Sequence, residues 1–189
     1  YRVMAADTID AVGVDQGVDL PESSTAQLPL VGSAGHKQAL LRAGEIAAGS
    51  GIDPAAIKHL ISRHGGRIDE VLDLIRADAS LGKPIDPTLP YLRAEVVHAV
   101  RFEAALHLED VLTRRTRLSV ESRDRGTASA LAVAELMASE LNWDQGRIDT
   151  EVDHYLSRVT AERASNEQVD DETADAYRVA VGEVRENFS

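Results

Sequence analysis

The sequence predicts an all-α protein, an irregular helical bundle that follows an N-terminal arm. Apolar residues recur at helical spacing through most of the 189 residues. The one short extended candidate, residues 28–31, contains Pro29, which favours an edge or a loop over a central strand. Hydrophobic residues make up 43% of the chain and aromatic residues only 4%, so we expect a core built from Leu, Val, Ile and Ala.

The first 35 residues predict one helix and then an irregular segment. Residues 2–12 place their apolar side chains at roughly helical spacing, namely Val3, Met4, Ile9 and Val12. Residues 13–35 are rich in Gly, Ser, Pro and Asp, which is typical of a linker. We therefore treat residues 1–35 as an arm.

Three short helices are expected next. Residues 37–48 are rich in Ala and Leu and end near Gly49. Asp53 and Pro54 form a cap followed by proline at the first helical position, so a helix begins there and ends at the glycine pair 65–66. The next helix presents a repeating apolar face of Ile68, Val71, Leu72 and Ile75.

A proline-rich connector divides the helical region into subgroups 36–80 and 91–189. Residues 82–90 contain three prolines, which remove amide donors and exclude a helix. Beyond the connector we expect helices over 91–107 and 127–141, one capped by Asp144, and a weaker one from 170. Residues 108–117 either continue the first of these or turn away from it.

Charge and composition exclude several classes of protein. The net charge of -12 argues against nucleic-acid binding, which needs a basic surface. Cysteine is absent, so disulfides, thiolate metal sites and a cysteine nucleophile are excluded. No apolar run is long enough to cross a bilayer, and we expect a cytoplasmic protein.

Catalytic patterns are weak. The segment Gly32-Ser33-Ala34-Gly35 has the wrong spacing for a dinucleotide-binding loop, and no βαβ pattern precedes it. No arrangement of Ser, His and Asp stands out as a triad. We assign no catalytic residue.

A repeated Glu-x-x-His pattern raises the possibility of a metal site. Glu95 and His98 share one helical face, and so do Glu151 and His154. Two such pairs and two further glutamates build the di-iron site of some four-helix bundles, and Glu135 and Glu140 are the available extra carboxylates. The simpler interpretation is polar residues on exposed helix faces, and we assign no metal ligand.

The densest basic cluster consists of Arg114, Arg115 and Arg117. Guanidinium groups pair well with phosphate or carboxylate, so these residues could bind an anion or face a neighbouring domain. The alternative is internal pairing with Glu109 or Asp110, which stand close by in the sequence.

Residues 91–118 carry a family resemblance. They read YLRAEVVHAVRFE and then LEDVLTRRTRL, which resembles the C-terminal domain of the aerobic, FAD-dependent glycerol-3-phosphate dehydrogenases. Shorter segments agree in the same order: YRVMA at residue 1, LPLVG at 28, HLISRHG at 59, LMA at 136 and LNWD at 141. Together they span about residues 1–160. The family commonly has tyrosine in place of His98.

The resemblance implies a function for a longer parent enzyme. That enzyme would oxidise sn-glycerol 3-phosphate to dihydroxyacetone phosphate, reduce FAD and pass electrons to membrane quinone from the inner face of the cell membrane. Residues 1–35 would then be the end of the flavin domain, and Tyr1 and Arg2 would approach the cofactor. Residues 36–189 would be a structural domain, without a cofactor of its own, that contacts the flavin domain and forms a homo-oligomer. The alternative is a stand-alone helical interaction module.

Overall fold

The structure, a computed structural model, describes residues 1–184, and its regular elements are helices. No strand occurs in that range, which confirms the all-α prediction; residues 185–189 of the helical region lie outside it. Five α-helices precede the proline-rich connector: α1 (Arg2–Gln16), α2 (His36–Leu41), α3 (Ala43–Ser50), α4 (Pro54–His64) and α5 (Ile68–Ala77). Five follow the connector: α6 (Arg93–Phe102), α7 (Leu118–Glu121), α8 (Ala130–Leu141), α9 (Gln145–Asn166) and α10 (Asp171–Val179).

Several predicted helix boundaries are confirmed. The Asp53 carboxylate accepts a hydrogen bond from the Ala55 amide at 2.8 Å, and the Asp144 carboxylate accepts one from the Arg147 amide at 2.8 Å. Each satisfies an amide that the first turn of a helix would otherwise leave unpaired. Asp170 caps α10 in the same way through Thr173. In the connector, residues 83–85 pair with residues 91–93, so the proline-rich loop closes on itself.

Three predicted boundaries are wrong. The first helix continues past residue 12 to Gln16. The helix expected over 37–48 is broken at Arg42, which separates α2 from α3. The helix expected over 91–107 ends at Phe102, because Ala104 takes a left-handed conformation with φ 54°. Residues 108–117 therefore turn away, and their centre forms a π-helical turn, η3 (Asp110–Arg115).

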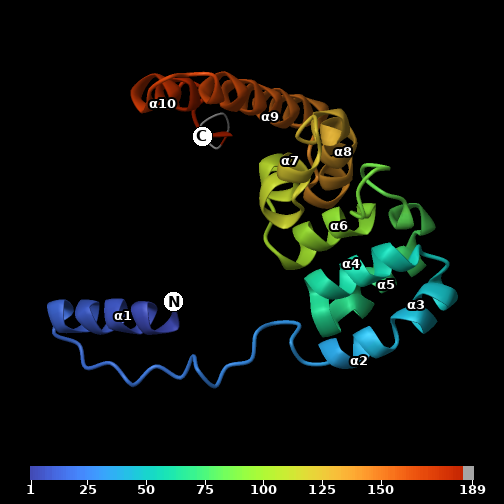
Figure 1. Ribbon diagram of the computed structural model, residues 1–189, viewed down its shortest axis with the longest axis horizontal. Coiled ribbons are helices and arrows are strands. Elements are labelled where there is room, and N and C mark those ends of the chain that lie inside the picture. Colours follow the sequence, from blue (N-terminus) through green and yellow to red (C-terminus); the bar gives the residue numbers. More distant parts are fainter. Residues whose placement is uncertain (185–189) are drawn as a thin grey trace.

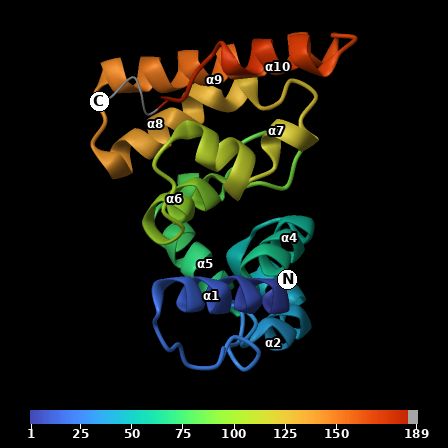
Figure 2. The same ribbon diagram turned by 90° about the vertical axis from the view of Figure 1, so that its left-hand side faces the viewer.

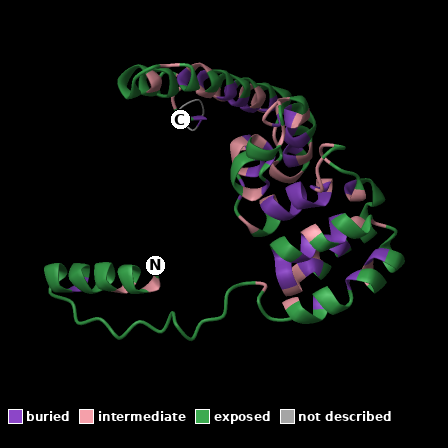
Figure 3. Ribbon diagram, in the orientation of Figure 1, coloured by how far each residue is buried: buried purple, intermediate pink, exposed green. Residues whose placement is uncertain are grey.

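Two hydrophobic cores meet at α6. The first core contains α2 to α5, and the second contains η3 and α7 to α9. Ala94 and Val97 of α6 pack into the first core, while Val96 and Ala99 pack into the second. Figure 1 shows α6 lying between the two groups, and Figure 3 shows its buried residues. An α-helix that is apolar on opposite faces in this way must be covered on both.

The N-terminal arm stands apart from both cores. Figures 1 and 2 show α1 joined to α2 only by an extended linker. The apolar residues of α1 are largely exposed to solvent; Val3 and Met4 are 72% and 73% exposed. Among residues 1–184, no helix combines the length and apolar character needed to cross a membrane.

The linker docks on the helical region through glycine backbones. The Gly66 amide donates to the Gly32 carbonyl at 2.8 Å. A Cβ on Gly66 would lie 1.7 Å from the Ala34 oxygen, and one on Gly65 would lie 2.1 Å from the Gly32 oxygen. No side chain fits at such distances, so the glycine pair that ends α4 is also the place where the arm joins the domain.

We predict that Gly66→Ala destabilises the chain by about 1–3 kcal/mol, because the added methyl group forces the linker turn away from its seat. Urea unfolding followed by circular dichroism measures the change. Gly49→Ala is the matched control, since a Cβ there meets no atom within 4 Å. That variant should be as stable as the parent chain or slightly more so. Equal stability of the two variants would contradict the docking role of Gly66.

Candidate functional site

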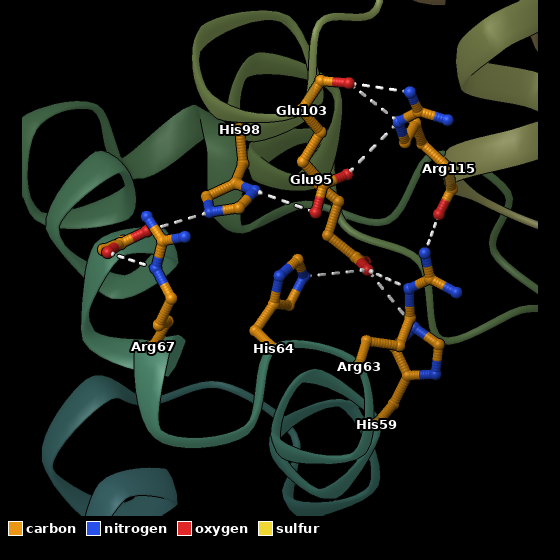
Figure 4. Close-up of polar contacts among 9 residues, drawn as sticks. His59, Arg63, His64, Arg67, Glu95, His98, Glu103 and Arg115 are labelled. Carbon is orange, nitrogen blue, oxygen red and sulfur yellow. Dashed lines mark hydrogen bonds and ion pairs between the residues drawn. The ribbon is translucent and has the colours of Figure 1, made fainter. Parts of the chain in front are cut away.

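Titratable side chains gather where α4, η1 (Gly65–Arg67), α5 and α6 meet. The cluster contains three histidines, three arginines and three glutamates, namely His59, His64, His98, Arg63, Arg67, Arg115, Glu70, Glu95 and Glu103 (Figure 4). Most of them come from the end of α4 and from α6. The titratable side chains therefore lie at the junction of the two cores. We call this group the junction cluster.

Glu95 is the most buried acid of the junction cluster, with 4% of its surface exposed. Its carboxylate accepts the Leu92 amide at 2.8 Å and thereby caps α6. His59 lies 3.3 Å away on the same carboxylate, and Arg63 and His64 each lie at 3.6 Å. Burial alone would raise the pKa of Glu95, but the neighbouring His59 and His64 and the Leu92 amide outweigh it and lower the pKa to about 2.

His98 lies between two other carboxylates. Its Nε2 is 3.2 Å from Glu70 Oε2, and its Nδ1 is 3.6 Å from Glu103 Oε1. The ring meets His64 edge to face, with centroids 4.6 Å apart. Burial and the neighbouring His64 lower the pKa of His98, which favours its neutral form.

Arginines close the cluster toward η3. Arg115 donates to the Glu103 carbonyl from both Nε and a terminal nitrogen, at 3.0 and 2.7 Å. Arg63 donates to the Arg115 carbonyl, so the end of α4 is tied to the end of η3. Arg67 binds Glu70 at 2.7 Å. Each arginine of the junction cluster therefore has an acceptor within the chain.

A second buried glutamate anchors α9. Glu151 is 1% exposed and accepts the Leu108 amide at 2.9 Å, His107 Nδ1 at 2.8 Å and Arg147 at 2.7 Å. Like Glu95, it satisfies a main-chain amide of a turn and contacts both a histidine and an arginine. A carboxylate in such a place is costly to remove, because its partners would stay buried without it.

The di-iron arrangement is not formed by the described residues. Glu95 and Glu151 bind different partners, and His154 lies near the Gly182 carbonyl. Glu140 pairs with Arg101, and Glu135 is exposed on α8. The expectation of exposed helix-face residues is also wrong for the two pairs, since Glu95, His98, Glu151 and His154 are all buried.

The three arginines singled out in the sequence all form ion pairs within the chain. Arg114 binds Glu109 and Asp110, and Arg117 lies 3.8 Å from Glu121. Arg115 belongs to the junction cluster. Their role toward an anion or another domain stays a prediction.

Tyr1 and Arg2 lie at the exposed start of α1. The side chain of Arg2 contacts the Tyr1 ring and the Thr25 carbonyl, and Tyr1 is 83% exposed. Their approach to a flavin therefore stays a prediction. Residues 1–184 form no βαβ unit and no glycine-rich phosphate loop.

One groove in the described structure lies away from the junction cluster. It has a volume of about 1170 Å³ and runs between α3, α5 and the proline-rich connector. Charged residues at its rim pair with one another, as Arg42 does with Glu45 and Arg76 with Asp69. The groove is open to solvent and holds no cluster of perturbed titratable groups, so we assign it no chemistry.

The junction cluster was largely missed by sequence reasoning. His59, Arg63 and Arg67 are spaced four residues apart, which places them near one face of a helix end. That spacing could have indicated a polar seam. It could not have indicated the partners, because Glu95 and Glu103 follow more than 25 residues later across the connector.

Comparison with known proteins identifies the family. Residues 23–148 match the family described as the C-terminal domain of alpha-glycerophosphate oxidase. The chain belongs to this family. It is 40% identical to glycerol-3-phosphate dehydrogenase 2 of Mycobacterium tuberculosis over 98% of its own length and 32% of the relative's. These findings confirm the resemblance carried by residues 91–118.

More distant relatives also match this chain over only part of their own length. The chain is 28% identical to a glycerol-3-phosphate dehydrogenase of Synechocystis over 82% of the chain and 28% of that protein. It is 27% identical to the mitochondrial glycerol-3-phosphate dehydrogenase of the mouse over 92% of the chain and 24% of that protein. The chain thus spans about a third or less of these relatives. No solved structure matches it.

We predict that Glu95 makes stability fall in acid. Its pKa is about 2 in the folded chain and 4.5 in the unfolded chain, so its contribution of roughly 3 kcal/mol is present above pH 4.5 and disappears as the pH falls toward 2. Glu95→Gln should lower the free energy of unfolding at neutral pH and flatten its dependence on pH in this window. Urea unfolding at several pH values measures both.

Glu45→Gln is the control for this experiment. Glu45 is exposed on α3 and has one ion-pair partner, Arg42, at 3.7 Å. The control should reproduce the acid profile of the unmodified chain. An unchanged profile in Glu95→Gln would contradict the assignment of this carboxylate as the acid-sensitive anchor.

Proposed function

We propose that this chain is the helical C-terminal part of an FAD-dependent glycerol-3-phosphate dehydrogenase. The parent enzyme would oxidise sn-glycerol 3-phosphate to dihydroxyacetone phosphate and transfer electrons through FAD to quinone. The observation that carries the proposal is 40% identity to the Mycobacterium tuberculosis dehydrogenase along 98% of this chain. Sequence identity that extends through the arm, the connector and both cores supports a common role for the whole chain rather than a shared local motif.

Within that enzyme, residues 36–184 would be structural. The charged groups of the junction cluster pair with one another and join the two cores. Because each of these groups has a partner inside the chain, their pairing holds the two cores rigidly together. Substrate and FAD would be held by the flavin domain, with the present chain as a buttress beside it.

The arm would supply the contact with the flavin domain. Its helix α1 exposes Val3, Met4, Ile9 and Val12, each more than half exposed, and packs against neither core. An exposed apolar patch of this kind marks an interaction surface. We propose that α1 packs on the flavin domain, where Tyr1 and Arg2 would approach the cofactor. The parent would attach peripherally to the inner face of the cell membrane, where quinone is available.

Dye reduction with sn-glycerol 3-phosphate tests the proposal that the flavin domain is catalytic and this chain is structural. The longer protein that contains this chain and a flavin domain should reduce the dye and show flavin absorbance. The 189-residue chain alone should do neither, because FAD and substrate would be held by the flavin domain. Activity of the chain alone would overturn its structural role, and a flavin-loaded longer protein that ignores this substrate would overturn the proposed parent activity.

We predict that the 189-residue chain self-associates through the exposed apolar residues of α1. The double variant Met4→Lys with Ile9→Lys should sediment as a smaller species than the parent chain at high concentration, because it replaces two of these residues by charged ones. Val169→Lys is the control, since Val169 is 99% exposed and lies between α9 and α10, outside α1. A parent chain that remains monomeric at high concentration would contradict the prediction.

A further inference from the structure

The junction cluster contains a group of side chains with the donor types of a metal site. His64, His98 and Glu103 each place one ligand atom within 4.8 Å of the other two. The two histidines are 8% and 3% exposed, whereas the Glu103 side chain is 31% exposed. The group is therefore a buried pair of imidazoles with a carboxylate at its solvent side (Figure 4).

Both histidines carry a buried nitrogen without a hydrogen bond. Within residues 1–184, neither His98 Nδ1 nor His64 Nε2 has a hydrogen-bond partner. His64 Nε2 has only a 3.6 Å ion-pair contact with Glu95 Oε1. Buried polar atoms are nearly always hydrogen-bonded, so two nitrogens in neighbouring rings that have only longer contacts leave room for a further ligand. His98 Nδ1 is directed at Glu103 Oε1, 3.6 Å away, which is too long for a hydrogen bond.

The opposite side of His98 is already oriented for metal binding. Its Nε2 lies 3.2 Å from the Glu70 carboxylate. A carboxylate in this position holds the proton on Nε2 and leaves the Nδ1 lone pair free, as in the carboxylate–histidine–metal arrangement of known sites. Glu70 is itself fixed by Arg67 at 2.7 Å.

We propose that His64, His98 and Glu103 bind a divalent transition-metal ion of the zinc class. Two imidazoles and one carboxylate form a donor set that suits zinc or cobalt better than magnesium or calcium, which prefer oxygen ligands alone. A water molecule would complete the coordination at the exposed side of Glu103. The proposal is independent of the parent enzyme's activity.

Binding requires only a small contraction of the site. Ligand atoms on a tetrahedral zinc ion lie about 3.4 Å apart, given bonds of about 2.1 Å. The present separation of up to 4.8 Å must therefore shrink by no more than about 1.4 Å. Glu103 follows the last residue of α6 and is partly exposed, so its side chain is free to supply most of this movement.

Arg115 opposes the metal but does not block it. Its guanidinium group is 3.7 Å from Glu103 Oε2 and would share that carboxylate with the ion. Its hydrogen bonds, however, go to the main-chain carbonyl of Glu103. Oε1 remains turned toward His98, so we expect moderate affinity rather than the tight binding of a site without a neighbouring cation.

The ion would link the end of α4, which belongs to the first core, to the end of α6. Because it binds only the folded chain, it should also stabilise that chain. Its effect is thus measurable without any enzyme assay.

The test is isothermal titration of the folded, metal-free 189-residue chain with Zn²⁺, together with Co²⁺ absorption spectra. We expect one ion per chain, a cobalt spectrum typical of four-coordinate nitrogen and oxygen ligands, and a rise in melting temperature with Zn²⁺. Glu103→Gln should weaken binding by more than about tenfold and abolish most of the thermal shift. Glu70→Gln should weaken it by about 10–100-fold through the orientation of His98.

His36→Gln is the matched control, because His36 lies on α2 outside the three-residue group. It should bind zinc as the unmodified chain does. Glu103→Gln alters a partly exposed side chain, so its fold should survive even if a His98 variant proves unstable. Absence of zinc binding to the folded parent chain, or equal binding by the parent chain and Glu103→Gln, would overturn the site.

Discussion

The rest of the structure depends on one buried carboxylate, that of Glu95 at the start of α6. Helix α6 has a hydrophobic core on each side, so its first turn has no access to bulk water for its unpaired amides. Glu95 satisfies the Leu92 amide from within the same helix and brings two histidines and Arg63 of α4 onto α6. One ionised group thereby joins a helix cap, a helix–helix contact and the boundary between the two cores.

Local chemistry determined what the sequence could predict. Aspartate caps, prolines and apolar periodicity act within a few residues, so the starts of α4 and α9, the connector and the all-α class follow from the sequence. The break at Arg42 and the end of α6 depend on tertiary packing. Ala104 adopts a left-handed conformation, which is unusual for alanine and so is not expected from the sequence. The junction cluster could not be predicted from the sequence for the same reason, since its carboxylates and histidines come from segments that are distant in the sequence.

The two Glu-x-x-His pairs show how one sequence pattern can serve different physical ends. The spacing correctly predicts that each pair lies on one face of its helix. It does not bring the two pairs together in one metal site. Glu95 and Glu151 both became anchors for main-chain amides, at two separate places. Of the two histidines in these pairs, only His98 has a buried nitrogen without a hydrogen bond beside another histidine and a carboxylate, and those neighbours come from outside its own pair.

The glycine contact between the linker and the end of α4 has a geometric consequence for the parent protein. Because the backbones of Gly32 and Gly66 meet directly, the chain leaves the helical region at a fixed point and in a fixed direction. Changes in the length of residues 17–31 would alter how far α1 travels from that point without moving the point itself. In the proposed parent, a domain that packs on α1 would therefore be attached at a fixed point through a linker of variable length.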